Sequence, residues 1–148
     1  MEMRRVEPKR YIGLRIIATI IDYGIYFGLF YLYLYSFGDK TENGYELNGW
    51  LCWPIPIFWF LYFVILESYT QTPGHDICKL IVVKTNGENL TIGDAFKRRL
   101  LDSIDIFIYG IPALICICNT PKYQRLGDLF ADTLVVKRSD LLIKEIVF

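Results

Sequence analysis

The sequence predicts an all-α integral membrane protein with two transmembrane helices, a third apolar segment broken by Gly and Pro, and a small cytoplasmic β element. Its 148 residues are 53% apolar and 16% aromatic, with a mean hydropathy of +0.31. These values are typical of a small polytopic membrane protein. Two apolar runs are also long enough to cross a hydrocarbon core of roughly 30 Å. At this length a single domain, residues 1–148, is expected.

The first apolar run, residues 11–37, is predicted to be a membrane helix behind a basic N-terminus. It is much longer than the apolar part of a cleavable signal peptide, so we expect it to be retained as a signal anchor. Tyr31, Tyr33 and Tyr35 lie near its end. Aromatic residues gather at the lipid–water boundary, which places that boundary near residue 35.

Two charged residues lie inside this first run. Asp22 is near its middle, where a membrane carboxylate costs roughly 2.5 kcal/mol or more and normally faces protein or water. Arg15 precedes it by seven residues, and seven helical residues turn through about 700°, so both side chains share one face. We expect this charged stripe to carry the function.

A second membrane helix is predicted over residues 50–68, after a short acidic loop. Trp50 and Trp53 mark its entry into the membrane. Glu67 lies in its last turn. One interpretation makes Glu67 an interfacial residue that reaches water, and the other makes it part of an ion-binding site.

The polar region of residues 69–99 is rich in Lys and Arg and is therefore predicted to be cytoplasmic. Within it, Thr91 and Asp94 have the spacing of a capping box that opens an amphipathic helix. The β-branched run 80–84 is followed by Asn86-Gly87, a hairpin turn signal. A second β-branched run covers residues 133–137, and we expect the two runs to pair as a small sheet.

The third apolar segment, residues 100–118, contains two aspartates and is broken at Gly110 and Pro112. The positive-inside rule places the N-terminus in the cytoplasm, yet the tail of residues 119–148 is as basic as the cytoplasmic parts. We therefore favour a bent or re-entrant helical hairpin that returns to the cytoplasm. A plain third span is the alternative. Either topology predicts a multi-pass protein of the cell membrane.

Several classes of function receive no support from the sequence. Basic residues flank apolar segments and form no continuous face, so nucleic acid is not an expected partner. The spacing of the four cysteines (Cys52, Cys78, Cys116 and Cys118) is a weak metal signal, and we expect no metal or cofactor. His75 is the only histidine, and no nucleophile motif or phosphate-binding loop accompanies it. We therefore expect no enzymatic activity.

Three short motifs occur in order along the chain: Arg15 with Asp22, Gln71-Thr72-Pro73-Gly74, and Gln124-Arg125-Leu126-Gly127-Asp128 followed by Thr133-Leu134-Val135-Val136. In these motifs and their spacing the chain resembles the RDD family of small membrane proteins, named for one arginine and two aspartates. The resemblance covers about residues 9–138 and makes Asp128 the second aspartate. It implies the family's architecture and a role in transport, since sodium–proton exchange has been attributed to some members.

The chain departs from the family pattern at three positions. His75 stands where the family usually has Lys, while Lys79 and Asp132 stand where Gly is common. A neutral His75 weakens any role of that position in binding a phosphate or a lipid head group, and Lys79 restores a charge nearby.

A mid-membrane carboxylate can hold either a proton or a cation, which is the minimal mechanism of exchange. In this hypothesis Asp22 is the exchanging site and Arg15 tunes it, because burial raises and a nearby Arg lowers the pKa of an Asp. Thr19 and Tyr26 on the same face add oxygen ligands for Na⁺ or another monovalent cation. Asp128 is expected in a Gly-containing turn at the cytoplasmic surface, as a partner for Arg15 or an entry ligand.

Two transmembrane helices and a hairpin are too few to enclose a pathway in the lipid bilayer. Transport therefore predicts a homo-oligomer, with Gly24 and Gly28 on one side of the first helix as helix-packing candidates. The alternative is a non-transporting scaffold, assembly factor or lipid-binding protein. In that case Arg15 and Asp128 simply form an ion pair with each other, and Asp22 fixes helix packing. Exchanging the two charges, Arg15→Asp with Asp128→Arg, should then restore the folding that either single change loses.

Overall fold

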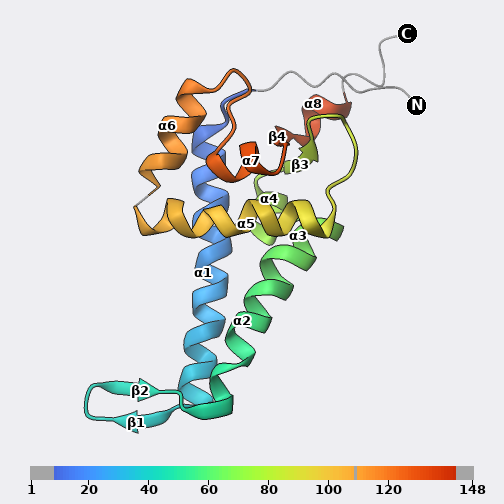
Figure 1. Ribbon diagram of the computed structural model, residues 1–148. Coiled ribbons are helices and arrows are strands. Elements are labelled where there is room, and N and C mark those ends of the chain that lie inside the picture. The colour runs from blue at the N-terminus through green and yellow to red at the C-terminus, as the bar shows by residue number, and fades with distance from the viewer. Residues whose placement is uncertain (1–8, 109, 143–148) are drawn as a thin grey trace.

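The computed structural model describes residues 9–108 and 110–142 (Figure 1). The expected cytoplasmic tail of residues 119–148 therefore lies partly outside the described residues. A long helix, α1 (Ile12–Phe37), leads into a small hairpin of β1 (Asp39–Thr41) and β2 (Gly44–Glu46). The hairpin occupies the acidic loop, for which the sequence indicated no strands.

The second apolar run is helical but not uniformly α-helical. A 3-10 turn (Gly49–Cys52) precedes α2 (Pro54–Trp59), and a π-helical segment (Phe60–Ile65) joins α2 to α3 (Leu66–Tyr69). Such wide turns are frequent at functional sites. In this chain the π-helical segment ends two residues before Glu67, which belongs to the site described below.

Two helices are long and apolar enough to cross a membrane, Ile12–Phe37 and Gly49–Ile77. Only 17% of the most apolar window of each is buried within the protein. The core helix of a soluble protein would be mostly buried, so apolar surface that remains exposed to this extent favours a lipid environment. The two predicted membrane helices therefore have counterparts in the structure.

The third apolar segment is bent. Helix α5 (Ile92–Phe107) begins at the predicted capping box: the Asp94 amide donates to the Thr91 hydroxyl at 3.2 Å, and the Thr91 amide to the Asp94 carboxylate at 3.2 Å. Helix α6 (Ile111–Asn119) begins after Gly110, whose φ of 75° is a left-handed conformation that favours glycine. Figure 1 shows α5 crossing α1 while α6 turns back beside the first half of α1.

The two β-branched runs pair as predicted. Strand β3 (Leu80–Lys84) is antiparallel to β4 (Thr133–Lys137), with Val82 opposite Val135. The turn at Asn86-Gly87 forms, because the Gly87 amide donates to the Lys84 carbonyl at 3.0 Å, but it does not begin a hairpin. The partner of β3 lies about fifty residues later in the chain, so the interpretation of this turn as a hairpin was wrong.

Three short helices complete the fold: α4 (Pro73–Ile77), α7 (Leu126–Phe130) and α8 (Arg138–Leu142). The apolar core joins α1 and the π-helical segment to the β3–β4 sheet; its buried members are Ala18, Val64, Cys78, Leu80, Val82, Leu90, Ala95 and Val135. A second, aromatic cluster lies further along α1, where Tyr26 packs with Tyr62 and Phe63. The sheet and the short helices α4 and α7 thus lie to one side of the first half of α1, as Figure 1 shows, while Ile16, Ile17 and Ile20 remain 44–66% exposed.

Candidate functional site: a buried ionic cluster beside a cavity

The buried face of α1 is the face that carries both predicted charges. Its buried residues are Arg15, Ala18, Asp22 and Tyr26, at the three- and four-residue spacing of one helix face. The predicted stripe is therefore a structural feature. Its two charges, however, do not pair with each other: they bind different elements.

Around this stripe lies a cluster of charged side chains, each at most 9% exposed: Arg15, Arg98, Arg99, Arg125, Asp22, Glu67, Asp102, Asp105 and Asp128. They come from α1, α3, α5 and the segment that opens α7. Burying this many ions is favourable only when they pair and hydrogen-bond closely. The function of the cluster therefore depends on which of these charges pair.

Asp128 is the centre of the cluster and is fully buried. It accepts an ion-paired hydrogen bond from Arg15, a second from Arg98 Nε at 2.6 Å, and a third from the Arg125 backbone amide at 3.0 Å. Burial alone would raise the pKa of Asp128, but the attraction of the three guanidinium groups holds that pKa far below its usual value. The expectation of an Asp128 at the cytoplasmic surface was wrong, because α7 packs against α5 and encloses it.

Glu67 is 1% exposed and does not reach water. It accepts hydrogen bonds from Arg99 at 2.6 and 2.9 Å and from Arg98 at 2.5 Å. The guanidinium of Arg99 also lies 4.9 Å from the ring centre of Phe63, a cation–π contact. The interfacial interpretation of Glu67 is therefore wrong, because α5 covers it with two consecutive arginines.

The burial of these arginines also affects the charge count on which the predicted membrane topology depends. Arg98 and Arg99 are 0% and 2% exposed, and Arg125 is 9% exposed. The three were counted among the cations that place their segments in the cytoplasm. Since each is paired with carboxylates inside the protein, they contribute little net charge to the loops.

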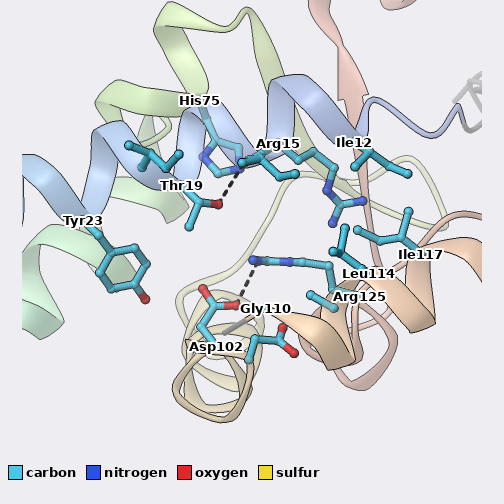
Figure 2. A pocket seen from close by; sticks show the side chains of 14 residues that line it. Ile12, Arg15, Thr19, Tyr23, His75, Asp102, Gly110, Leu114, Ile117 and Arg125 are labelled. Atoms are coloured by element: carbon cyan, nitrogen blue, oxygen red, sulfur yellow. Dashed lines mark hydrogen bonds and ion pairs between the residues drawn. The ribbon is translucent and has the colours of Figure 1, made fainter. Parts of the chain in front are cut away.

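Asp102 continues the network along α5. It accepts a hydrogen bond from Arg99 Nη1 at 2.7 Å, and its other oxygen lies 2.9 Å from Arg125 Nη2 without the alignment of a good hydrogen bond. Figure 2 shows Arg125 and Asp102 facing each other across the cavity floor. The apolar third segment therefore contributes a paired carboxylate to the cluster.

Asp105 differs from the paired carboxylates Asp128, Glu67 and Asp102. It is 4% exposed, and within residues 9–108 and 110–142 neither of its carboxylate oxygens has a hydrogen-bond partner. Burial raises the pKa of Asp105; Arg125 lowers it in part, and the neighbouring carboxylates Asp102 and Asp128 raise it further. A buried carboxylate without a partner is costly unless it binds a proton or a cation.

Asp22, by contrast, is saturated by the start of α4. It accepts hydrogen bonds from the Thr72 hydroxyl and the Gly74 amide, both at 2.6 Å, and lies 3.1 Å from His75 Nδ1. A Cβ on Gly74 would overlap the Ala18 carbonyl and approach Asp22 Oδ1 to 2.8 Å. Only glycine therefore lets α4 dock this closely on α1.

The remaining candidates take packing roles within the chain. The Thr19 hydroxyl donates to the Arg15 carbonyl at 2.8 Å. The Tyr26 ring stacks on Phe58, with the ring centres 5.6 Å apart. Neither is hydrogen-bonded to Asp22 within the part of the chain that the structure describes, so their expected role as ligands beside Asp22 has no geometric support. Around Gly24 and Gly28 an added Cβ would meet nothing within 4 Å, so this side of α1 is open.

A cavity of about 350 Å³ lies between α1, α5 and α6 (Figure 2). Helices α1 and α6 supply mainly aliphatic walls, and the ionic cluster supplies the polar floor. The polar lining residues are Arg15, Thr19, Tyr23, His75, Asp102, Asp105 and Arg125. Asp105 therefore borders a space that is large enough for a ligand.

The charges of the cluster do not balance. Within residues 9–108 and 110–142, four buried arginines face five buried carboxylates, which leaves an excess of one negative charge when His75 is neutral. In a low-dielectric interior such an excess is strongly unfavourable. Among the described residues, no group of three or more His, Cys, Asp or Glu side chains could hold a metal ion. Binding of a proton or a cation would neutralise this excess charge.

Sequence reasoning missed most of this cluster. Arg98, Arg99, Asp102 and Asp105 share the inner face of α5, and their three- and four-residue spacing was a visible signal. That signal is ambiguous in a sequence, because charged residues at such spacings usually form a solvated outer face. His75 was considered as a lone histidine and as a departure from the family motif, but not as a neighbour of Asp22, beside which it lies.

Two apolar helices and an internal ionic cluster define a small helical membrane protein. The RDD family model matches residues 10–132, most of the chain, and the chain therefore belongs to the RDD family. No curated protein and no solved structure matches it.

The fold explains two of the departures from the family motif. Lys79 has a φ of 55° and Asp132 a φ of 50°, in the left-handed region. Glycine adopts this conformation without a steric penalty, which is a physical reason for the family's glycines at both positions. Lys79 is exposed and has no ion pair within the described residues, so it does not supply a charge to the cluster.

Proposed function

We propose that this protein is a non-catalytic, multi-pass protein of the cell membrane that exchanges a monovalent cation for a proton at the buried ionic cluster. The observation that carries the proposal is the excess carboxylate: Asp105 is buried, has no partner in the described residues, and borders the cavity. A proton and a cation would neutralise the same charge and so compete for one site. Competition of this kind couples the two movements.

The exchanging group in this proposal is Asp105 rather than Asp22. Both oxygens of Asp22 accept hydrogen bonds from α4, and the close approach of Gly74 leaves no room for a cation at that carboxylate. The oxygens of Asp105 border the cavity and accept no hydrogen bond from the part of the chain that the structure describes. Arg125 and Asp102 on the cavity floor would then tune Asp105 as Arg15 was expected to tune Asp22.

The exposed face of α5 supports a placement of this helix in the membrane interface. Large apolar residues follow one another every four positions along it and are 38–47% exposed: Ile92, Phe96, Leu100 and Ile104. The charged residues of the helix, apart from Lys97, face inward or are partly buried. This arrangement is the reverse of that in a helix that borders water. We propose that α5 lies along the bilayer surface, as in the bent-hairpin topology, with the N-terminus in the cytoplasm.

One copy of the chain offers too few helices to enclose a path across the bilayer. We therefore propose a homo-oligomer, in which the open side of α1 at Gly24 and Gly28 contacts another copy. The unfilled space around both glycines supports this contact, because it would accept a closely packed helix.

The test uses purified protein in sealed liposomes that contain a pH-sensitive dye. Sodium, lithium or potassium is added across an imposed proton gradient, and wild type is compared with Asp105→Asn and with Asp76→Asn, a matched change at an exposed carboxylate. If the protein exchanges cations for protons, the added cation should drive proton movement in wild type and in Asp76→Asn. The same movement should be absent in Asp105→Asn. A flat trace from folded wild type would favour the non-transporting scaffold instead.

A further inference from the structure

The cavity beside α1 has two parts with different chemistry. Its walls are aliphatic, formed mainly by Ile16 and Ile20 of α1 and by Leu114 and Ile117 of α6. Its floor holds the single carboxylate that has no partner among the described residues, Asp105. A hydrated alkali ion makes no use of aliphatic walls, whereas a ligand with an apolar body does.

The neighbouring charges are already matched, so they neither need nor exclude a cation at Asp105. Arg15 is paired with Asp128, and Arg125 Nη2 lies 2.9 Å from Asp102. His75 lies beside Asp22, and Tyr23 from α1 adds an aromatic ring to the lining. Tyr and other aromatic rings attract cations through their faces. Arg125 Nε and Nη2 have no hydrogen-bond partner among the described residues, but Asp102 matches the charge of Arg125. The charge of the floor that remains unmatched is therefore the negative charge of Asp105, which favours a monocation.

An alkali ion would gain less from this lining than an organic cation would. Such hard cations take several oxygen ligands at once, and the free acceptors on the floor are few. The Thr19 hydroxyl donates to the Arg15 carbonyl, and its oxygen adds one acceptor to the two of Asp105. A primary ammonium needs only one carboxylate and an acceptor or two, and its carbon chain gains from the aliphatic walls.

We propose that the cavity is a binding site for an organic monocation, an amine with a compact apolar body, whose ammonium group pairs with Asp105. This inference rests on the proposed function and specifies the class of cation that the protein exchanges. When the protonated amine enters, Asp105 releases its proton, and the carboxylate–ammonium pair replaces the carboxylic acid. The charge of the cluster is neutral in both states, so the exchange is electrically balanced at the site.

The test measures binding of hexylammonium chloride to the full chain in nanodiscs of zwitterionic lipid, by calorimetry and by the rise in melting temperature on saturation. Hexanol and hexanoate have the same apolar body with no charge or a negative charge. We expect saturable binding of hexylammonium alone. Equal binding of hexanol would mean that the cavity is merely apolar, and preferred binding of hexanoate would assign recognition to Arg125; either result overturns the proposal.

Asp105→Asn should weaken hexylammonium binding at least about 30-fold, because removing one partner of a buried charge pair is costly. Its folding should survive, since the change removes a buried charge that has no partner in the described chain. Asp76→Asn should bind as wild type. Ala113→Phe narrows the cavity from α6 and should weaken hexylammonium more than methylammonium. Unchanged affinity in both cavity variants would refute the site.

Binding and transport can fail separately. Sodium-driven proton movement without hexylammonium binding would refute the organic cation and leave exchange intact. Hexylammonium binding that Asp105→Asn abolishes, in a protein that moves no protons, would keep the site and refute exchange.

Discussion

Replacing Asp128 with Asn tests whether the ionic cluster is the main determinant of this fold. The substitution preserves the shape of the side chain and removes its charge. In the wild type this fully buried carboxylate serves Arg15, Arg98 and the backbone amide of Arg125 at once. The variant leaves Arg15 without a carboxylate, while Arg98 retains Glu67.

The expected loss is large. Breaking a buried ion pair by neutralising one partner costs about 3–5 kcal/mol, because the other charge stays buried and uncompensated. A domain of this size typically has a total stability of roughly 5–15 kcal/mol. At about 2–4 °C per kcal/mol for a chain of this length, the melting temperature should fall by roughly 6–20 °C.

The dependence on pH has a definite sign. The pKa of Asp128 is lower in the folded protein than in the unfolded chain. Its contribution is therefore fully present above the unfolded pKa of about 4 and is lost as the pH falls below that value. The difference between wild type and Asp128→Asn should shrink as the pH drops from 4 towards 2.

The assay is thermal unfolding of the full chain in detergent micelles, followed by circular dichroism, at pH 7 and over the acid range. Asp76→Asn is the control: its exposed pair with Arg138 at 2.9 Å should contribute less than about 1 kcal/mol. A melting temperature for Asp128→Asn equal to that of the control would refute the reasoning.

Exchanging the two charges, Arg15→Asp with Asp128→Arg, extends this test. An isolated pair would be restored by the exchange, as expected from the sequence. In the structure an arginine at position 128 would face Arg98 and Arg125. We therefore now expect the double variant to remain unfolded, and recovery of the wild-type melting temperature would show that Arg15 and Asp128 act alone.

Three further predictions follow from particular contacts. Gly74→Ala should destabilise the protein by about 2 kcal/mol or more, because the added methyl group overlaps Ala18 and Asp22. Gly28→Ala lies in open space and should stay within about 1 kcal/mol of wild type. Equal melting temperatures of the two variants would contradict this prediction. Lys79→Gly should stabilise by about 1 kcal/mol because φ is 55°, and a lower denaturation midpoint would contradict this. A nitroxide at Leu100→Cys should be more accessible to oxygen than to a water-soluble nickel chelate in bilayers, and the reverse order would remove α5 from the membrane interface.

The sequence by itself determined the local features of this protein. The lengths of the apolar runs predicted the two long helices, and the capping box at Thr91 predicted where α5 begins. The β-branched runs identified both strands of the β3–β4 sheet. Gly110, whose backbone is in the left-handed conformation, lies at the predicted break, directly before α6. Each of these depends on residues close together in the chain, which is why pattern and spacing suffice.

The partners of the charged residues were decided only by the tertiary structure. Arg15 and Asp128 are 113 positions apart, and Asp22 meets Thr72 and Gly74 some fifty positions later. A charge in a sequence carries no sign of whether it will be solvated or paired, because that depends on which helices pack around it. Asp105 was visible as an aspartate in an apolar segment, but its lack of a partner emerged only once every neighbouring arginine had been matched.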